Sequence, residues 1–275
     1  MLERFKHRKV LITGAGSGLG KALAESFAKL GWSVWIADIN KDAASSVAEL
    51  IKPNANDVAS SHCDITSPEH FEHLASEIKD KWGQLDIIIN NAGVASSGFL
   101  QETPPDVWKR TMTPNLDGVY HGCYFLEPLL PIDGPAHIIN VASFAGIASA
   151  PGMLAYNVSK ASVIALSESL RIEMADRNIG VSVACPAFFQ TNLVDSMKEA
   201  NDKVKATVNK WMAASKIDAN DVATDIIKGI EQNKFYIISH DYARKIYWFK
   251  RFFHGRFLNK MISNARKLKS KLQTH

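Results

Sequence analysis

The chain alternates short apolar runs with longer stretches in which apolar residues recur every three or four positions. Runs dominated by Val, Ile and Leu predict strands that are buried on both faces. Seven strands are predicted, at Lys9–Thr13, Ser33–Ala37, Val58–Cys63, Leu85–Asn90, Ala136–Ala142, Val181–Cys185 and Phe235–Ile238, of which Val58–Cys63 has the weaker pattern. Because helical patterns separate them, we expect an α/β fold with one doubly wound parallel sheet and helices on both faces.

Two helices have recognisable boundary signals. The first spans about Leu19–Leu30, with Leu23 and Phe27 on one face and Gly31 as its C-terminal stop. A later helix is predicted to begin after Ser67, which can cap its N-terminus ahead of a proline, and to reach Trp82.

Size and charge divide the chain into two parts. With 275 residues and 46% hydrophobic content, it can bury one substantial core, so residues 1–241 are interpreted as a single catalytic domain. Residues 242–275 hold ten Lys and Arg and no acidic residue, which leaves 22 basic and all 28 acidic residues in the first 241. An acidic globular domain therefore carries a basic C-terminal extension.

The extension has the pattern of a basic amphipathic helix, interrupted at Gly255. Its apolar positions, at three- and four-residue spacing, are Ile246, Phe249, Phe253, Phe257, Met261, Ala265, Leu268 and Leu272. Two interpretations carry equal weight: the helix lies on an anionic membrane surface, or it packs against the acidic domain or a second subunit. A nucleic-acid partner is not expected, because no nucleic-acid-binding fold accompanies the charge.

Targeting and redox signals favour the cytoplasm, with the membrane periphery as an alternative. The N-terminus does not resemble a signal peptide, and no apolar run approaches the roughly 18 residues of a membrane span. Cys63, Cys123 and Cys185 are far apart and lack metal-ligand spacing, so we expect free thiols and no metal site.

A glycine-rich loop joins the first strand to the first helix. In Thr13–Gly20, the candidate binding residues are Gly14, Ser17, Gly18, Leu19 and Gly20. Such a loop lets the backbone approach a pyrophosphate, and the helix N-terminus offers free N–H groups. Asp38 ends the next strand about 20 residues further on, the spacing of a Rossmann-like dinucleotide site. Its carboxylate can bind both ribose hydroxyls and would repel a 2′-phosphate, so NAD(H) is predicted; nearby Lys41 leaves NADP(H) possible.

Three polar residues form a candidate catalytic group. Tyr156 and Lys160 lie four residues apart on one helix face, and Ser143 ends the fifth strand at the edge that receives the glycine loop. Interconverting an alcohol and a carbonyl requires a proton at the substrate oxygen. A lysine ammonium favours the phenolate of a nearby tyrosine, and a serine hydroxyl can bond the substrate oxygen. The Tyr–Lys pair alone would suggest only a half-exposed helix face; with the loop and Ser143 it predicts acid–base catalysis by Tyr156.

With these motifs the chain resembles the short-chain dehydrogenase/reductase family, from Val10 to about Ile238. The resemblance also covers Asp64 and Ile65, Asn90 to Gly93, and Asn115. It implies that Asp64 and Ile65 lie near the adenine, and that Asn90, Asn91, Ala92 and Gly93 line the cofactor path. Asn115 should distort its helix and extend a proton relay from Lys160, which should also reach the nicotinamide ribose. Pro186 and Thr191 should flank the carboxamide, and dimers or tetramers should form through the helices of Asn115 and Tyr156.

Two positions depart from the family pattern. Pro186 precedes Ala187 where glycine is usual, and alanine adopts positive φ less readily. Pro114 precedes Asn115 and removes a backbone donor, so the local kink can arise by a different route.

Residues 187–215 follow the sixth strand, where the family places its variable substrate lid. The lid is rich in apolar residues: Phe188, Phe189, Leu193, Val194, Met197, Val204, Val208, Trp211 and Met212. Upstream, Phe144, Ile147, Pro151 and Met153 are predicted to face the same space. These residues favour a lipophilic alcohol, aldehyde or ketone. The alternatives are a small polar carbonyl substrate, a dinucleotide-binding regulator without turnover, and an epimerase or dehydratase, for which the chain lacks an extra substrate domain.

Overall fold

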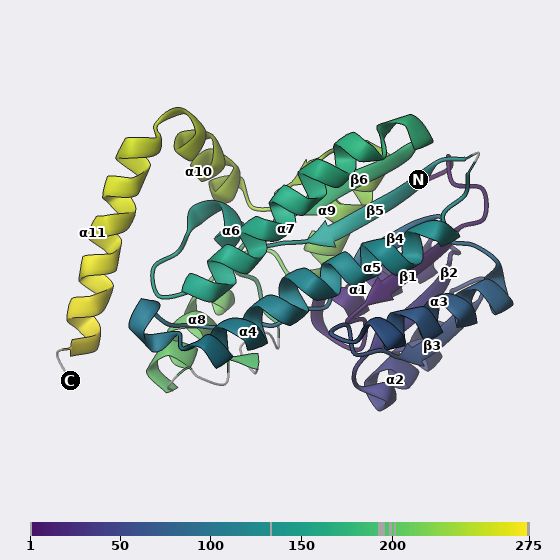
Figure 1. The fold of residues 1–275 in the computed structure, drawn as a ribbon, viewed down its shortest axis with the longest axis horizontal. Coiled ribbons are helices and arrows are strands. Elements are labelled where there is room, and N and C mark those ends of the chain that lie inside the picture. Colours follow the sequence, from purple (N-terminus) through teal and green to yellow (C-terminus); the bar gives the residue numbers. More distant parts are fainter. Residues whose placement is uncertain (1, 133, 192–195, 198–199, 201, 274–275) are drawn as a thin grey trace.

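The computed structural model describes every residue except 1, 133, 192–195, 198–199, 201 and 274–275. Its centre is one sheet of seven parallel strands in the order β3-β2-β1-β4-β5-β6-β7 (Figure 1). The strands are β1 Lys9–Thr13, β2 Ser33–Asp38, β3 Val58–His62, β4 Ile87–Asn90, β5 Ala136–Val141, β6 Ile179–Ala184 and β7 Tyr236–Ile237. The predicted doubly wound α/β fold is confirmed.

Helices cover both faces of the sheet. One face packs against α1 (Gly18–Lys29), α2 (Lys41–Ile51) and α9 (Ala219–Glu231). The other packs against α3 (Pro68–Trp82), α5 (Gly118–Leu126) and α7 (Leu154–Glu173). The remaining helices are α4 Pro105–Met112, α6 Phe144–Ala148, α8 Asp202–Ala213, α10 Asp241–Phe252 and α11 His254–Gln273.

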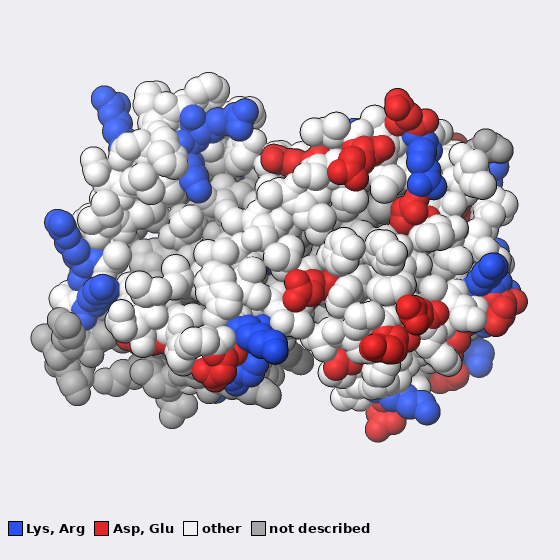
Figure 2. Space-filling model, viewed as in Figure 1, with Lys and Arg blue, Asp and Glu red and all other residues white. Residues whose placement is uncertain are grey.

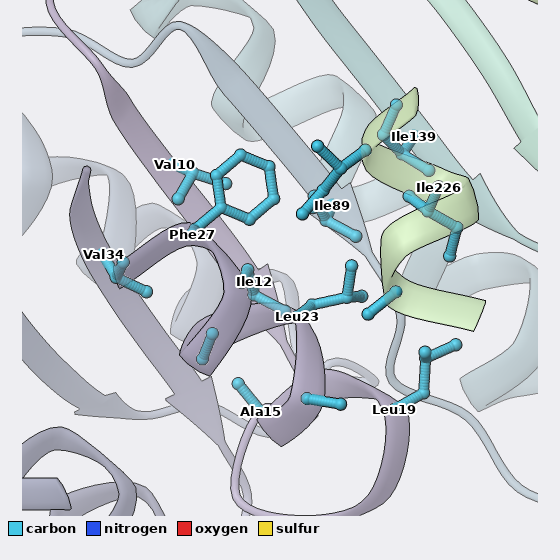
Figure 3. Close-up of a cluster of buried hydrophobic side chains, with 14 of the residues drawn as sticks. Val10, Ile12, Ala15, Leu19, Leu23, Phe27, Val34, Ile89, Ile139 and Ile226 are labelled. Atoms are coloured by element: carbon cyan, nitrogen blue, oxygen red, sulfur yellow. The ribbon is translucent and has the colours of Figure 1, made fainter. Parts of the chain in front are cut away.

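Alternation along the strands builds a core on each face. Val10 and Ile12 of β1 point to the side of α1, where they meet Leu23 and Phe27 (Figure 3). Leu11, between them, points to the opposite face and belongs to the second cluster. All five side chains are fully buried.

The direction of chain progression reverses between β1 and β4. From β1 the chain proceeds outward through β2 to β3, and after α3 it returns to β4 on the other side of β1 and continues to β7. In a parallel sheet this reversal opens a crevice at the carboxyl ends of the strands, where ligands bind. The glycine loop, Asp38, the residues after Asn90, and Ser143 all follow these ends.

Strand boundaries differ from the sequence prediction by one or two residues in every strand except β1, and the differences matter most in three strands. β4 begins at Ile87 and β7 comprises only Tyr236 and Ile237, so both are shorter than predicted. β6 begins two residues early, at Ile179, because Asn178 adopts a left-handed conformation with φ 54° that turns the chain directly into the strand.

The C-terminal extension forms two helices, α10 and α11, which we call the arm. The predicted break at Gly255 was wrong by two residues: α10 ends at Phe252, and Phe253 takes a non-helical conformation with φ −128° and ψ 49°. The turn lets Phe257, which is fully buried, approach Phe249, with ring centroids 6.5 Å apart. Phe253 is half exposed and not part of a continuous buried stripe. None of the described helices is long and apolar enough to cross a membrane.

Candidate active site

The glycine loop is tied to two neighbouring strands. Gly14 donates its backbone N–H to Ala37 O at 2.7 Å. The Thr13 hydroxyl accepts the N–H groups of Asn91 and Ala92, at 3.0 and 3.1 Å. Gly14 has φ +64°, and a Cβ there would lie 2.8 Å from Ala92 Cα. Only glycine permits this approach, so β1 and the Asn91–Ala92 segment form one compact edge.

The N-terminus of α1 is arranged for an anion. Ser17 is extended at the cap position, and its side chain makes no capping hydrogen bond to the helix. The first N–H groups, of Gly18, Leu19 and Gly20, therefore lack that usual partner. A cavity of about 400 Å³ adjoins them, lined by Gly18, Gln190, Thr191, Asn209, Met212 and Ala213. This cradle fits the pyrophosphate of a dinucleotide cofactor.

Asp38, at the end of β2, lies beside the glycine loop. Its carboxylate accepts the backbone N–H of Gly16 at 2.8 Å and that of Asn40 at 2.9 Å. These bonds hold the carboxylate beside the glycine loop, where it would face the ribose hydroxyls. Ile39, next in the chain, is 64% exposed and forms part of the same surface.

Asp64 and Ile65 follow β3 at the same edge. One oxygen of the Asp64 carboxylate accepts both the backbone N–H and the hydroxyl of Thr66, at 2.9 and 2.8 Å. The Asp64 backbone N–H donates to His70 Nδ1 at 3.0 Å. Ile65 packs against Gly118 at the start of α5. Both residues are thereby fixed at the strand end where the family places the adenine.

Asn90 does not line the cofactor path as predicted. Its side chain is buried and donates to Asn140 Oδ1 at 2.9 Å, while the amide of Asn140 donates to Ser167 at 3.1 Å. The cause is strand alternation, which directs Asn90 away from the crevice and toward α5 and α7. Its neighbour Asn91 faces the loop instead and donates to Thr13 O at 2.9 Å.

Asn115 lies in a π-helical turn, Thr113–Asp117, between α4 and α5. The turn replaces the ordinary pattern with a bond from Gly118 N–H to Thr113 O, and it accommodates Pro114, which has no N–H to donate. The Asn115 amide accepts Val94 N–H at 2.8 Å and donates to Val94 O at 2.9 Å. It also donates to the Ser159 hydroxyl at 3.0 Å. The expected helix distortion is present.

Tyr156, Ser143 and Lys160 come together below the crevice. The Ser143 hydroxyl lies beside the phenol of Tyr156 and favours its ionised form. The Ser143 oxygen also caps α6 by accepting Ala145 N–H at 3.1 Å. Lys160 Nζ lies 6.0 Å from the centre of the Tyr156 ring and donates to Val141 O at 2.9 Å. Gly93 closes the other side, since a Cβ there would lie 3.3 Å from Lys160 Nζ.

Burial shapes the acid–base properties of this group. It raises the pKa of Tyr156, and the neighbouring Ser143 hydroxyl opposes that effect. Burial lowers the pKa of Lys160 to about 8, opposed by the negative charge that Cys185 would carry as a thiolate. The sequence prediction attributed a lowered pKa of Tyr156 to the lysine. In the structure the desolvation of the phenol outweighs such a contribution.

The described part of the lid closes over Tyr156 with apolar side chains. Met153, Met197 and Met212 form one buried cluster with Tyr156 and Val208. The loop after β4 holds the lid, because Ala95 N–H donates to the Ser196 hydroxyl at 2.8 Å. Phe188 and Trp211 pack with ring centroids 5.4 Å apart. The predicted lid residues Leu193 and Val194 lie outside the described residues.

Two residues predicted for the substrate side have a different role. Phe144 and Ile147 pack in the second core cluster with Ala243 and Ile246 of α10. They turn away from the lid because α10 of the arm packs against α6.

The Pro186–Ala187 segment is stabilised by a residue that sequence reasoning missed. Ala187 does not have a positive φ, so the replacement of the usual glycine by alanine introduces no backbone strain at this position. Its N–H donates to His240 Nδ1 at 3.4 Å, and His240 Nε2 lies 3.1 Å from Phe188 O. Pro186 O accepts Phe144 N–H at 2.8 Å. His240 thus fixes the base of the lid. Within the described residues, no group of three His, Cys, Asp or Glu is placed to hold a metal ion.

Comparisons with known proteins agree with this geometry. The family model that describes short chain dehydrogenases matches residues 8–202. An uncharacterized oxidoreductase of Bacillus subtilis (strain 168), YxbG, is 32% identical over 216 residues, covering 77% of this chain and 79% of its own.

Two solved structures are also similar. A short chain dehydrogenase/reductase from Burkholderia phymatum, in complex with NAD, superposes with a TM-score of 0.84 at 29% identity, covering 91% of this chain and 95% of its own. A short-chain dehydrogenase from Sphingobium yanoikuyae, in complex with NADPH, gives 0.74 at 24% identity, covering 95% and 94%. The second likeness bears on the fold alone.

Proposed function

The chain belongs to the short-chain dehydrogenase family, and we propose that it interconverts a lipophilic alcohol with its aldehyde or ketone, using NAD(H) and Tyr156. The main support is that Tyr156 lies beside Ser143 on one side and in a buried cluster with Met153, Met197 and Met212 on the other. A polar reaction centre thereby adjoins an apolar space.

The roles follow from the contacts. Nicotinamide, when bound, supplies or accepts the hydride. The Tyr156 phenol gives a proton to the substrate oxygen in reduction and removes it in oxidation. The Ser143 hydroxyl holds that oxygen and stabilises its developing charge. Lys160 places a cation beside the site, and Asn115 holds the segment that carries both residues of the Tyr–Lys pair.

Asp38 supports NAD(H) over NADP(H). The carboxylate is held at the ribose position by two backbone N–H groups, and a 2′-phosphate there would meet negative charge. A Cβ on Gly16 would lie 2.9 Å from Asp38 Oδ2, so the glycine allows the carboxylate to approach the loop this closely.

The lid supports an apolar substrate. Met153, Met197 and Met212 are each at most 7% exposed and are adaptable in shape. A hydrophobic wall contributes about 0.8 kcal/mol per buried methylene. Across a series of primary and secondary alcohols, kcat/KM should therefore rise about fourfold per added methylene until the space is filled. A flat series, or a preference for small polar carbonyls, would reject this substrate class.

A homodimer is proposed through α5 and α7. Tyr120 and Tyr124 stack on the outside of α5 with ring centroids 5.8 Å apart, and Ile172 of α7 is 77% exposed. This uncovered apolar face suits a second copy. Tyr124→Lys should yield a monomer in sedimentation velocity, and an unchanged oligomer would count against the interface.

Free, buried cysteines support a cytoplasmic enzyme.

A further inference from the structure

The outward side of α10 exposes two large aromatic residues. Trp248 is 52% and Phe252 70% exposed, and their rings stack with centroids 5.7 Å apart. Helical spacing places Lys245 on the same side, three positions before Trp248, and Arg251 three positions after it. Both cations are exposed. An aromatic pair between two cations is a costly surface to leave in water without a partner.

The second helix of the arm continues this character. Leu258 and Ile262, one turn apart on α11, are 42% and 48% exposed. The arm contains ten Lys and Arg and no acidic residue after Asp241. On the face shown in Figure 2, basic side chains line the arm without acidic ones, whereas acidic side chains gather over the part that holds the sheet.

The arm already has its contact with the body, on its other side. Ala243 and Phe257 are fully buried, and Lys250 Nζ donates to Ile147 O at 2.5 Å. The exposed aromatics are therefore not the residues that fasten the arm. They are free to meet a separate partner.

We propose that the arm docks on an anionic lipid bilayer, with Trp248 and Phe252 inserted at the headgroup level. Aromatic rings favour that interface, and neighbouring lysines and arginines bind lipid phosphates. A second arm fits less well, because it would bring ten further cations against the first ten.

Docking would also hold the segment beside the active site near the lipid, under the arm, an extension that rests on the proposed function. Lys269 of α11 lies 4.6 Å from the centre of the Phe99 ring, and Leu268 is beside Gly152. Next to these residues, Gly98 pairs with Met153, which packs against Tyr156. A membrane-dissolved alcohol would then be concentrated near the segment that packs against Tyr156.

Flotation with vesicles tests the docking. The full-length protein is floated with phosphatidylcholine and phosphatidylglycerol in equal parts, and with phosphatidylcholine alone. Wild type should float only with the anionic vesicles. The variant Trp248→Gln/Phe252→Gln should bind them about tenfold more weakly, since it loses most of the inserted apolar area. The control Leu50→Gln/Ile132→Gln removes exposed apolar residues from the body and should bind as wild type does.

Three results would overturn the proposal: no flotation of wild type, undiminished flotation of the Trp248/Phe252 variant, or loss of oligomeric mass by that variant without lipid. The last would assign the face to a second copy.

Turnover of a short, water-soluble alcohol without vesicles is measured in parallel. Turnover without flotation rejects docking alone, and flotation without turnover rejects the proposed activity alone. With a vesicle-dissolved long-chain alcohol, the variant should raise KM about tenfold and leave kcat unchanged.

Discussion

The Asn115 amide donates a hydrogen bond to the Ser159 hydroxyl at 3.0 Å, which ties the π-helical turn to the helix between Tyr156 and Lys160. The same amide also accepts the backbone N–H of Val94 and donates to the Val94 carbonyl, on the loop after β4. One side chain thus connects three segments that meet at the reaction centre. Its effect on the chemistry would be through the position of α7.

Ser159→Ala removes this link while keeping the bonds between Asn115 and Val94. We predict that kcat falls about tenfold, the equivalent of about 1.4 kcal/mol of misplaced catalytic contacts, with KM for NADH within about twofold. Ser162→Ala is the control, because its exposed hydroxyl bonds only Val158 O of its own helix. A wild-type kcat in Ser159→Ala would show that the link does not position Tyr156.

Asp38 should determine the choice of cofactor. Wild type is predicted to have a kcat/KM with NADH at least about tenfold above that with NADPH, because the carboxylate repels a 2′-phosphate. Asp38→Ser/Ile39→Arg should reverse the preference. The nearby Asp42→Ser, which changes an exposed carboxylate of α2, should not. Comparable kcat/KM values of wild type with the two cofactors would contradict the assignment.

His137 should make stability fall in acid. It is fully buried, accepts from Arg4 at 3.0 Å through Nδ1, and its Nε2 lies 2.7 Å from the Ser182 hydroxyl. Burial lowers the pKa of His137 well below its usual 6.5, assisted by Arg4 and Arg171. The folded protein thus binds fewer protons than the unfolded chain below pH 6.5, so acid favours unfolding.

The free energy of unfolding, from urea titrations, should then fall by up to about 1.4 kcal/mol per pH unit below 6.5. In His137→Gln the free energy of unfolding should fall less steeply with decreasing pH. In the control His73→Gln, which changes a side chain that is 75% exposed, the steepness should equal that of wild type. Equal slopes in wild type and His137→Gln would contradict the prediction.

Lys160 should cost stability while serving catalysis. Burial lowers its pKa to about 8 from 10.5. At pH 7 the folded protein holds a buried cation, so Lys160→Met should unfold at higher urea, with a gain on the order of 2 kcal/mol, and lose turnover. Wild type recovers stability between pH 8 and 10.5, where the folded state has released the proton and the unfolded chain has not. The gain should therefore shrink over that range; a gain independent of pH would indicate packing alone.

The sequence predicted the strands well because buried parallel strands are nearly continuous apolar runs, as in β1 and β5. It also predicted Ser143 at the end of the fifth strand and Tyr156 with Lys160 on one helix face, because strand ends and helix periodicity determine these positions. Asn90 was misplaced because strand alternation turns its side chain inward, and Phe144 because its orientation depends on the arm that packs against α6. Neither Ser159 nor His240 stood out, because each acts through a contact between segments far apart in the chain. No local pattern encodes such a contact.

Tyr156→Phe tests the central claim most directly. Oxidation of a long-chain alcohol is followed through the absorbance of reduced nicotinamide, and NADH binding is measured separately by fluorescence titration. We predict that Tyr156→Phe binds NADH within a few-fold of wild type and lacks measurable turnover, because phenylalanine fills the same space without a proton to exchange. A Tyr156→Phe enzyme that turns over at the wild-type rate would contradict it.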